Sequence, residues 1–397
     1  MYLSTPLAVI GGGPAGLRAA EIAATSGVEV VLFDAKPSVG RKLLVAGKGG
    51  FNLTHGEEMS HFISRYSGPG QPDEVWKSLL EDFDSSAMRE WASGLGVETF
   101  QASSGRVYPK ALKAAPLLRR WIMRLRKLGV RFEMNHRWSD LVSGRPHTLE
   151  FSNGKSIRAD AVVFALGGGS WPQTGSDGFW VKKFREYGID CRDLLPANCG
   201  WRHAWSRSVL DVAEGKPIKN IVARVGDNVV SGELMVTRYG LEGGVIYQLG
   251  KALREMESPA IAIDFKPTFT HGQLVARMES VRRGFLDEAR IRWRLSDAAY
   301  AILSQSAWAD VDSLAREAKH CVIPLDGPQP LAEAISSAGG VCWNEVDAGL
   351  MLSRFPGIFV AGEMIDWEAP TGGYLMQGCF ATGTRAGRAA VEWLGEF

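Results

Sequence analysis

The amino-acid sequence predicts an α/β protein: a Rossmann-like dinucleotide-binding domain that carries a β-rich insert domain and a small helical subdomain. A short apolar strand followed by glycines at GxGxxG spacing stands near the N-terminus. A second apolar strand, ending in glycine and an acidic residue, stands near the C-terminus, and short strands and turns fill the middle of the chain. The predicted domains are residues 1–195 with 338–397, residues 196–268 with 319–337, and residues 269–318.

The composition is that of an ordinary globular protein. Of 397 residues, 45% are hydrophobic and 22% are charged, which provides enough apolar material for a sizeable core. The formal net charge of +1 gives no bulk attraction to nucleic acid or to membranes. The sequence has no apolar run of about eighteen residues and no basic N-terminal region of the kind that opens a signal peptide. We therefore expect a cytoplasmic protein with no membrane partner.

The cysteines predict neither a metal site nor a dithiol relay. Cys191, Cys199, Cys321, Cys342 and Cys379 include no CxxC or CxxxxC pair. Their odd number in a chain of this length is typical of a reducing compartment. No metal is expected.

The N-terminal stretch predicts the first strand and helix of a dinucleotide-binding unit. Residues 7–10 form a short apolar run, as in a strand buried in a parallel sheet. Gly11 permits a tight turn, Gly13 lets a pyrophosphate approach the backbone, and Gly16 lets the helix pack closely on the strand. The pyrophosphate would lie at the helix N-terminus, where unpaired N–H groups favour negative charge. An isolated GxGxxG can be an ordinary glycine turn, but here strand, helix, strand and acidic residue follow in order.

The second strand and the segment after it supply the next candidate ligand contacts. Residues 28–33 predict a strand, and Asp34 at its end is placed to bond a ribose hydroxyl. Residues 36–55 interleave four glycines with four cations, which predicts a loop against a flat or phosphorylated ligand; the alternative is a surface loop with scattered charge. His55 and Lys48 are polar candidates for the reacting centre, although a lone histidine is more often structural.

The pattern from residue 71 to residue 128 is mainly helical. Its basic part, residues 117–127, predicts a solvated helix face with apolar members turned inward, and a nucleic-acid patch is the alternative. Between the helices, residues 105–109 predict a loop that approaches a ligand.

Further strands follow. The turn residues Asn153-Gly154 predict a tight hairpin. The last of these strands is continuously apolar and ends in Gly167–Gly169, where a ligand can lie at the carboxyl edge of a parallel sheet. The predicted strands are residues 130–134, 148–151, 155–158 and 161–166.

The middle of the chain changes character. Residues 201–253 predict short strands and turns with no helix until the end of the segment, which indicates a β-rich insert. Residues 271–314 predict helices. Their arginines alternate with acidic residues, which favours a mixed-charge solvated face, and RNA binding is the alternative.

The C-terminal segment predicts a last buried strand and a closing helix. Residues 355–363 end in a glycine and Glu363, whose carboxylate is suited to accept hydrogen bonds from sugar-alcohol hydroxyls. Residues 370–378 are followed by a helix that ends near residue 394. The N-terminus of this helix, pointed at the pyrimidine edge of a flavin, would stabilise the negative charge of the reduced ring. The alternative is an ordinary helix closing a Rossmann sheet.

These motifs resemble those of the aminoacetone-oxidase-like FAD-binding flavoproteins, a family of two-dinucleotide-binding-fold flavoproteins, along most of the chain. The resemblance rests on GGGPAG with Asp34, on GRKLLVAGKGGFNLTH, on the strand that ends at Gly167, and on PGIFVAGEMIDWEAPTGGYLMQG. A weaker match covers residues 232–244 in the insert. The family implies a FAD domain built from both chain ends.

The resemblance also implies residue roles. Asp34 would hold the adenosine ribose, Glu363 the ribityl chain, and the segments 47–52 and 372–377 would surround the isoalloxazine. The predicted catalytic residues are His55, Lys48 and Tyr374. The predicted cofactor contacts are Gly11, Gly13, Pro14, Ala15, Gly16, Asp34, Ala35, Arg41, Lys42, Gly47, Gly49, Asn52, Leu53, Gly167, Gly362, Glu363, Gly372, Gly373, Tyr374 and Gln377.

One departure from the family pattern is clear. Many relatives carry Ser-Gly-Gly-Gly-Arg-Cys-Asn where this chain has Ala-Gly-Lys-Gly-Gly-Phe-Asn at residues 46–52. Gly50 and Phe51 therefore replace an arginine and a cysteine, so a role of those two residues in relatives does not transfer. The sequence is similar to a divergent, uncharacterised subgroup.

The function expected from these observations is hydride transfer between a substrate carbon and N5 of FAD. We favour reduction of a C=C bond, driven by transiently bound NAD(P)H, in a small-molecule substrate rather than an RNA-borne one. The alternatives are an amine or aminoketone oxidase that uses dioxygen, a uridine-reducing enzyme of ribosomal RNA, and a flavin-binding protein without turnover. A second GxGxxG after a strand is absent from the sequence, so no stable NAD(P)H domain is predicted.

Overall fold

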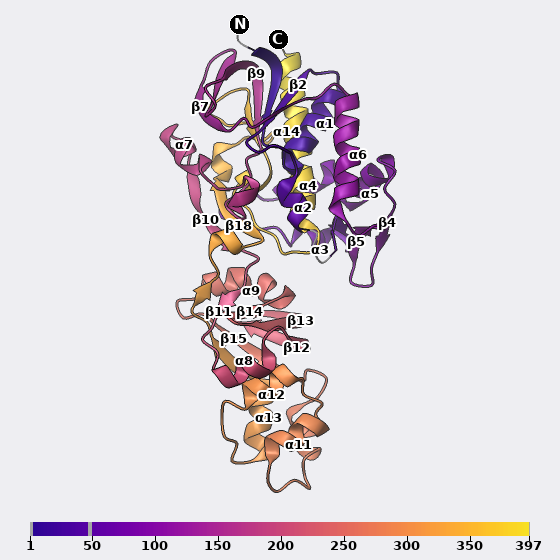
Figure 1. Ribbon diagram of the computed structural model, residues 1–397, viewed down its shortest axis with the longest axis vertical. Coiled ribbons are helices and arrows are strands. Elements are labelled where there is room, and N and C mark those ends of the chain that lie inside the picture. Colours follow the sequence, from indigo (N-terminus) through magenta and orange to yellow (C-terminus); the bar gives the residue numbers. More distant parts are fainter. Residues whose placement is uncertain (1–2, 47–49, 397) are drawn as a thin grey trace. The chain divides into compact units, whose positions relative to one another are not determined.

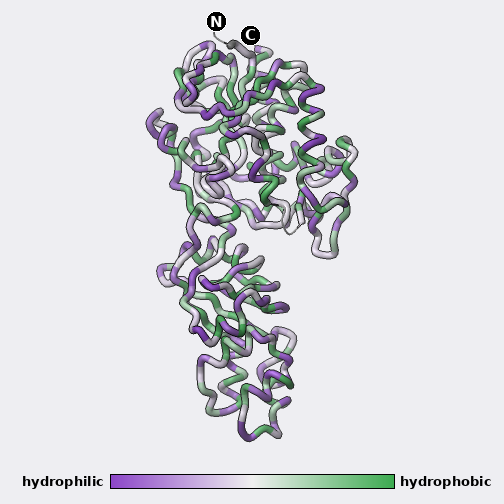
Figure 2. The backbone as a smooth tube through the Cα atoms, viewed as in Figure 1, coloured by the Kyte–Doolittle hydropathy of each residue, from purple (hydrophilic) through white to green (hydrophobic). Residues whose placement is uncertain are grey.

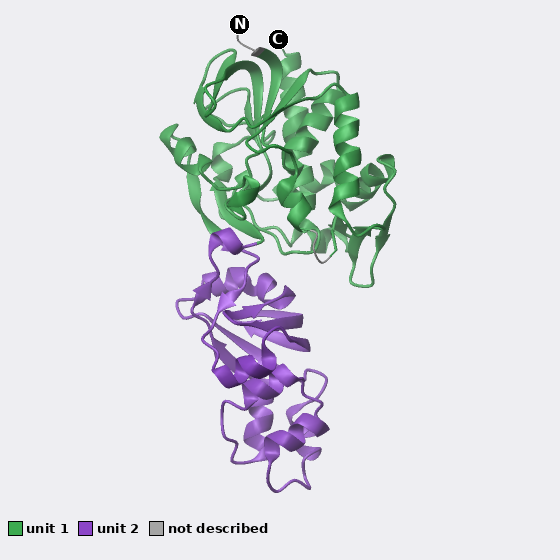
Figure 3. Ribbon diagram, in the orientation of Figure 1, with its two compact units in different colours: residues 1–195, 335–397 green, residues 196–334 purple. Residues whose placement is uncertain are grey.

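The computed structural model describes residues 3–46 and 50–396. The described residues form two compact units, residues 1–195 with 335–397 and residues 196–334 (Figure 3). The predicted three-part division stays a prediction. In the structure, the helices between residues 269 and 318 share one apolar cluster with the strands of the second unit, because both bury their hydrophobic faces against each other.

The first unit is built on a twisted sheet whose strands lie in the order β6-β2-β1-β9-β8-β7, with β19 also paired to β9. Strands β1, β2, β6, β9 and β19 are parallel, as the apolar runs predict, and Leu7 pairs with both Val30 and Ala161. The Rossmann-like α/β prediction is thereby confirmed. The strands are β1 (Leu3–Ile10), β2 (Val30–Asp34), β6 (Arg131–Met134), β7 (Trp138–Val142), β8 (His147–Phe151), β9 (Ser156–Phe164) and β19 (Ile358–Val360).

Strand β9 corrects the prediction of separate strands at residues 155–158 and 161–166. It is one strand that alternates between buried and exposed positions at first and is then buried at every position. The change has a structural cause, because the beginning of β9 pairs antiparallel with β8 and its end pairs parallel with β19. The predicted hairpin turn at Asn153-Gly154 is confirmed, since the Gly154 N–H donates to the Phe151 carbonyl at 2.9 Å.

Helices α1 (Pro14–Thr25) and α14 (Tyr374–Gly395) come from opposite ends of the chain and lie side by side (Figure 1). Two glycines of α14 let their backbones touch. A Cβ on Gly383 would overlap the Ala15 carbonyl oxygen, and a Cβ on Gly387 would lie 2.9 Å from the Ala19 carbonyl oxygen. The remaining helices of this unit are α2 (Arg41–Ala46), α3 (Met59–Ile63), α4 (Val75–Asp82), α5 (Ser85–Gly94), α6 (Ala114–Lys127) and α7 (Trp180–Glu186).

A buried carboxylate fastens α1 to the neighbouring helices. Glu21 is 4% exposed and accepts hydrogen bonds from the indole N–H groups of Trp91 at 2.9 Å and Trp121 at 3.0 Å. It also forms ion pairs with Arg18 at 3.1 Å and Arg124 at 3.0 Å. Arg124 belongs to the basic segment 117–127, so one of its charges is used inside the fold, and the segment presents the apolar inner face that was predicted.

A small antiparallel sheet in the order β3-β5-β4 stands beside the first unit's helices. Its middle strand, β5, corrects the prediction of a loop at residues 105–109. Helix α2 likewise corrects the prediction that residues 36–55 are all loop, because six residues without glycine are enough for a short helix. The strands are β3 (Thr54–His55), β4 (Thr99–Gln101) and β5 (Arg106–Pro109).

The second unit contains an antiparallel sheet in the order β16-β15-β12-β13-β14-β11-β17. The expectation of no helix before the end of residues 201–253 is wrong, because Ser206 caps helix α8 through its hydroxyl. The elements are β11 (Trp201–Arg202), α8 (Arg207–Ala213), β12 (Pro217–Val225), β13 (Asn228–Thr237), β14 (Gly240–Glu242), α9 (Gly244–Arg254), β15 (Ala260–Asp264), α10 (His271–Ala276), α11 (Phe285–Arg292), α12 (Asp297–Leu303), α13 (Val311–Lys319), β16 (Cys321–Pro324) and β17 (Gly327–Pro328).

Strands β10 (Cys191–Ala197) and β18 (Ser336–Val341) pair with each other where the chain passes from one unit to the next and back. Hydrophobic positions recur along the chain of both units, each of which has its own buried apolar cluster (Figure 2). Across the described ranges, no helix is both long and apolar enough to span a bilayer.

The contact between α1 and α14 predicts a specific stability defect. Gly383→Ala forces a methyl group into the Ala15 carbonyl oxygen, so we expect the free energy of unfolding to fall by about 1–3 kcal/mol. Urea denaturation of the purified protein measures this change. The matched control is Gly395→Ala at the end of α14, where the added methyl meets no described atom within 4 Å. Equal midpoints for the two variants would contradict the close packing.

Candidate functional site

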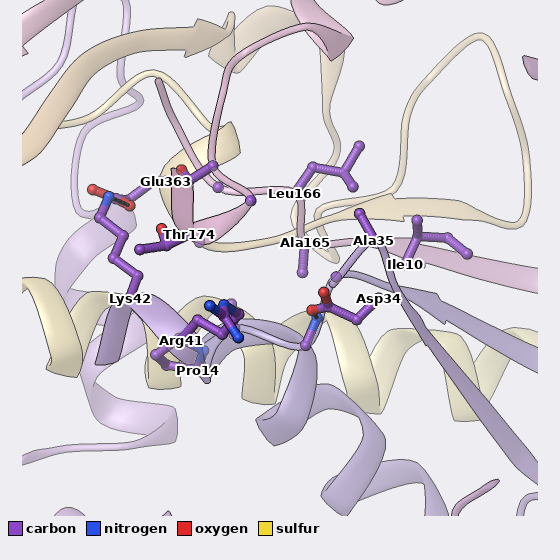
Figure 4. Close-up of a pocket in the computed structure, with 18 of the residues that line it drawn as sticks. Ile10, Pro14, Asp34, Ala35, Arg41, Lys42, Ala165, Leu166, Thr174 and Glu363 are labelled. Atoms are coloured by element: carbon purple, nitrogen blue, oxygen red, sulfur yellow. Dashed lines mark hydrogen bonds and ion pairs between the residues drawn. The ribbon is translucent and has the colours of Figure 1, made fainter. Parts of the chain in front are cut away.

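A cavity of about 850 Å³, its open mouth included, lies at the carboxyl ends of the parallel strands of the first unit. Strands β1, β2 and β9 and the turn after β19 contribute to its walls. Figure 4 shows the side chains of Lys42, Arg41 and Glu363 around it. Of the predicted cofactor contacts, the structure brings together Gly11, Gly13, Pro14, Ala15, Asp34, Ala35, Arg41, Lys42, Gly167, Gly362 and Glu363 along this cavity.

The three glycines of the turn from β1 to α1 differ in what surrounds them. Gly11 has a φ of 109°, and a Cβ there would overlap the Ala165 carbonyl oxygen. A Cβ on Gly16 would overlap the Gly11 carbonyl oxygen, so Gly16 packs inside the fold rather than lining the cavity. A Cβ on Gly13 would meet no described atom within 4 Å and would extend into free space. No described protein atom therefore requires glycine at position 13, and its predicted role, the close approach of a pyrophosphate, stays a prediction.

The N-terminus of α1 faces this cavity without a side-chain cap from any described residue. Pro14 occupies its first turn, where a missing N–H costs nothing, and Pro14 and Ala15 both line the cavity. Such a helix end attracts a phosphate through its unpaired N–H groups and its dipole.

Asp34 fixes the turn that forms the cavity floor. Its Oδ2 accepts the Gly12 N–H and its Oδ1 accepts the Lys36 N–H, both at 2.8 Å. Burial raises the pKa of Asp34, although these backbone hydrogen bonds oppose the rise. Each oxygen keeps a lone pair for a further donor, so a ribose hydroxyl remains a suitable partner.

Glu363 and Lys42 form an ion pair beside the cavity (Figure 4). Lys42 Nζ donates to Glu363 Oε2 at 2.8 Å and to Ser170 Oγ at 2.6 Å. Lys42 comes from α2, so the short helix that the sequence did not predict carries the cation that orients this carboxylate. The Lys42 ammonium thereby holds the Glu363 carboxylate in position beside the cavity.

Sequence reasoning missed part of the lining. One group follows Gly167 along the chain. The run GGGSWPQTGSDG there is rich in glycine and hydroxyl residues, and this composition could have indicated a ligand-binding loop. The other group had no local signal, because β6, β7 and α14 bring it in from elsewhere. Outside the predicted motifs and strands, the missed residues are His136, Arg137, Trp138, Thr174, Gly175, Ser176, Phe179 and Cys379.

The other predicted contacts gather at the start of α14. Gly373 has a φ of 109°, and a Cβ there would lie 2.5 Å from the carbonyl group of Thr54. Leu53 is fully buried, and its N–H donates to the Val107 carbonyl oxygen at 2.9 Å. Gln377 is also fully buried, and its Nε2 donates to the Phe83 carbonyl oxygen at 2.6 Å. Gly47, Lys48 and Gly49 lie outside the described residues, so these predictions stay predictions.

This region contains polar atoms that need partners. Asn52 Oδ1, Thr54 Oγ1 and Gln377 Oε1 are buried and have no hydrogen-bond partner among the described residues. Unpaired buried polar atoms are costly, so a bound group with matching donors and acceptors would stabilise them. The heteroatom edge of an isoalloxazine offers such groups, and the uncapped N-terminus of α1 suits its pyrophosphate. The residues present therefore fit FAD.

His55 is held by contacts at both ring nitrogens. Its Nδ1 accepts the Glu57 N–H at 3.2 Å, and Nε2 lies 3.0 Å from the Ser104 carbonyl oxygen, which can only accept. In this geometry Nδ1 accepts a hydrogen bond and Nε2 donates one, so both ring nitrogens have partners. The ring stacks on Tyr374 with centroids 5.3 Å apart, so the structure does bring these two predicted catalytic residues together.

Tyr374 donates its hydroxyl to Glu57 Oε1 at 2.6 Å, and Arg65 pairs with the other oxygen of that carboxylate at 2.8 Å. Burial and the neighbouring Glu57 raise the pKa of Tyr374. Burial opposes the change at Glu57, yet hydrogen bonds from Arg65 and Tyr374 hold its pKa below the usual value. The phenol therefore stays protonated and the carboxylate ionised at neutral pH. A catalytic role for either His55 or Tyr374 stays a prediction.

The comparison with known families decides the identity of the fold. The sequence profile described as the "HI0933-like protein Rossmann domain" matches residues 5–389. The chain belongs to this family. Its members are FAD-binding two-dinucleotide-fold flavoproteins, and the protein is an FAD-dependent oxidoreductase, as the sequence predicted.

Individual relatives cover nearly the whole chain. The 3-dehydro-bile acid delta(4,6)-reductase of Clostridium scindens is 28% identical over 97% of this chain and 99% of its own. The ribosomal RNA dihydrouridine synthase of Escherichia coli is 24% identical over 93% of this chain and 94% of its own. Among solved structures, the 3-ketosteroid-delta4-(5alpha)-dehydrogenase of Rhodococcus jostii is similar in fold, with a TM-score of 0.54 at 17% identity over 98% and 97% of the two chains.

A substitution at Gly13 should abolish FAD binding without affecting folding. Gly13→Val places a side chain in free space, so we expect a folded protein with wild-type thermal stability in the cofactor-free form. The side chain occupies the place of a pyrophosphate, so the variant should purify colourless and fail to bind added FAD. Absorbance spectra and FAD fluorescence titration measure this. Gly272→Val, also free of described neighbours within 4 Å, is the control and should stay yellow. A yellow Gly13 variant would contradict the phosphate placement.

Removal of the Lys42–Glu363 ion pair should weaken the binding of FAD. Lys42→Met leaves the Glu363 carboxylate without its cation beside an anionic cofactor, so the affinity for FAD should fall roughly ten- to a hundredfold. Fluorescence titration of the cofactor-free protein gives the dissociation constant. The control is Lys155→Met, which removes an exposed charge from the turn before β9. If both variants bind FAD like the wild type, Lys42 does not act on the cofactor through Glu363.

Proposed function

We propose that the protein is a reductase that uses FAD to saturate a C=C bond conjugated to a carbonyl group in a small-molecule substrate. A shared chemistry supports the proposal. The name of the Clostridium scindens relative describes reduction of ring double bonds in a 3-dehydro, hence 3-keto, bile acid. The name of the Escherichia coli relative describes formation of dihydrouridine, in which the C5=C6 bond conjugated to the uracil carbonyl is reduced.

The residues that would hold the cofactor follow from the geometry. The start of α1, from Gly11 to Ala15, suits the pyrophosphate, Asp34 suits the adenosine ribose, and Glu363 suits the ribityl hydroxyls. Asn52, Thr54 and Gln377 supply the unpaired polar atoms at the start of α14 for the ring. When bound, FAD exchanges a hydride with the substrate at its ring nitrogen N5.

The overall reaction balances with one reductant. One alkene carbon receives a hydride and the neighbouring carbon receives a proton from solvent, so a C–C single bond replaces the double bond. A reduced nicotinamide, bound transiently, supplies the two electrons of each turnover. Tyr374 is no base in this scheme, because its phenol stays protonated beside Glu57. Its hydroxyl orients the Glu57 carboxylate, which Arg65 also binds.

A small molecule is favoured over RNA because much of the positive charge is already paired. In the second unit, Arg290 pairs with Asp297 at 3.0 Å and Arg292 with Glu288 at 2.8 Å. In the first unit, Arg124 pairs with the buried Glu21. Reduction of uridine in ribosomal RNA is the second candidate, supported by the Escherichia coli relative, and it uses the same chemistry on a different substrate.

A single-turnover assay tests the proposed reaction without assuming an electron donor. The holoenzyme is reduced with dithionite under anaerobic conditions and mixed with 4-androstene-3,17-dione, a ketone with a conjugated double bond. We expect the flavin absorbance to return as the saturated ketone forms, which mass spectrometry detects. A separate arm replaces dithionite with NADPH. Reoxidation by dioxygen but by no conjugated ketone or uridine-containing RNA would support an oxidase and contradict the proposal.

A further inference from the structure

Arg106 is a half-buried cation whose side chain forms no hydrogen bond or ion pair with any residue the structure describes. It stands on β5 directly opposite His55 in the register with β3. A Cβ placed on Gly372 would lie 3.5 Å from Arg106 Nε and 3.5 Å from Cε2 of Tyr374. The guanidinium and the Tyr374 ring therefore flank the same glycine at the entrance to α14.

The charges around Arg106 leave it uncompensated. The Glu57 carboxylate beside Tyr374 is already bound by Arg65, at 3.1 Å from Nε and 2.8 Å from Nη2. Both ring nitrogens of His55 are engaged elsewhere, by the Glu57 N–H and the Ser104 carbonyl oxygen. The positive end of the α14 dipole adds to the cationic field. A half-buried guanidinium in this setting favours an electronegative partner that the fold does not supply.

We propose that Arg106 binds the carbonyl oxygen of the substrate and stabilises the negative charge that this oxygen gains during reduction. This inference rests on the proposed function. When a hydride reaches the β-carbon of a conjugated ketone, the electron pair of the C=C bond shifts and the carbonyl oxygen becomes an enolate oxygen. A proton from solvent then bonds to the α-carbon and restores the carbonyl group. Arg106 itself neither gains nor loses a proton.

An arginine is suited to this task. Its planar guanidinium stays charged and offers several N–H donors in a fixed arrangement, which suits an oxygen whose charge grows in the transition state. The other polar side chains of the cluster are less suited, because the Tyr374 hydroxyl and both ring nitrogens of His55 already have partners.

The position of Arg106 also argues against a role with the phosphates. The pyrophosphate site lies at the start of α1, and the part of α14 beside that turn is Gly383 rather than Tyr374. Nine residues of helix separate Gly383 from Tyr374, which is about 14 Å along the axis. Arg106, beside Gly372, is therefore at the opposite end of the proposed cofactor from its phosphates.

The test compares Arg106→Met and Arg106→Lys with the wild type in the anaerobic single-turnover assay with 4-androstene-3,17-dione. We expect the limiting rate of flavin reoxidation to fall on the order of 10²- to 10³-fold in Arg106→Met and less in Arg106→Lys. The dissociation constant for FAD and the thermal midpoint should stay at wild-type values. Arg119→Met, at an exposed position on α6, is the control and should react like the wild type.

Chemical rescue supplies a readout that a structural role would not move. Added guanidinium chloride should restore part of the reoxidation rate in Arg106→Ala, whereas sodium chloride at the same concentration should not. Wild-type rates in all Arg106 variants, or loss of FAD binding by them, would overturn the inference and leave the proposed function standing. If the wild-type enzyme itself reduces no conjugated ketone, the proposed function fails, and the inference fails with it.

Discussion

The close contact between α1 and α14 is the constraint on which the site depends. Glycine at positions 383 and 387 lets the backbones of the two helices touch at Ala15 and Ala19. Because helices are rigid rods, this contact fixes the N-terminus of α14 relative to the N-terminus of α1. One helix end faces the cavity of the glycine turn, and the other faces the unpaired polar atoms near Thr54. A long cofactor that needs both ends can bind only if this helix pair holds.

The buried Glu21 keeps that pair in place from the other side. A carboxylate that is 4% exposed would be costly alone, but two indole N–H groups and two guanidinium groups surround it. Arg18 also donates to Thr384 of α14 at 2.9 Å, so the network reaches both helices. Burial lowers the pKa of Arg18, while its ion pair with Glu21 opposes the change. The charges of α6 that resemble a nucleic-acid patch in the sequence thus serve partly to position α1.

The sequence predicts those parts of the fold whose causes are local. The turn from β1 to α1 is predictable because Gly11 and Gly16 each meet a neighbouring carbonyl oxygen where no side chain fits. The sequence predicts two strands where the structure has only β9, because the burial pattern of β9 changes where its partner β8 gives way to β19. Strand β19 lies almost 200 residues further along the chain, so no local pattern announces it. The sequence predicts that residues 105–109 approach a ligand, but it does not single out Arg106, because the surroundings of Arg106 are formed by Gly372 and by the paired charges of Glu57 and Arg65. Contacts between distant segments decide the site, and periodicity does not record them.

The structure shows what Gly50 and Phe51 do at the two positions where many relatives carry an arginine and a cysteine. Gly50 adopts a φ of 113°, which side chains rarely accept, and a Cβ there would lie 3.3 Å from the Tyr108 ring. Phe51 is 2% exposed and belongs to the apolar core. Neither residue has a polar side chain to offer a substrate. A cation does reach the start of α14 from a different segment, because β5 brings Arg106 there. Arg106 stands two residues before Tyr108, the tyrosine that a Cβ on Gly50 would contact.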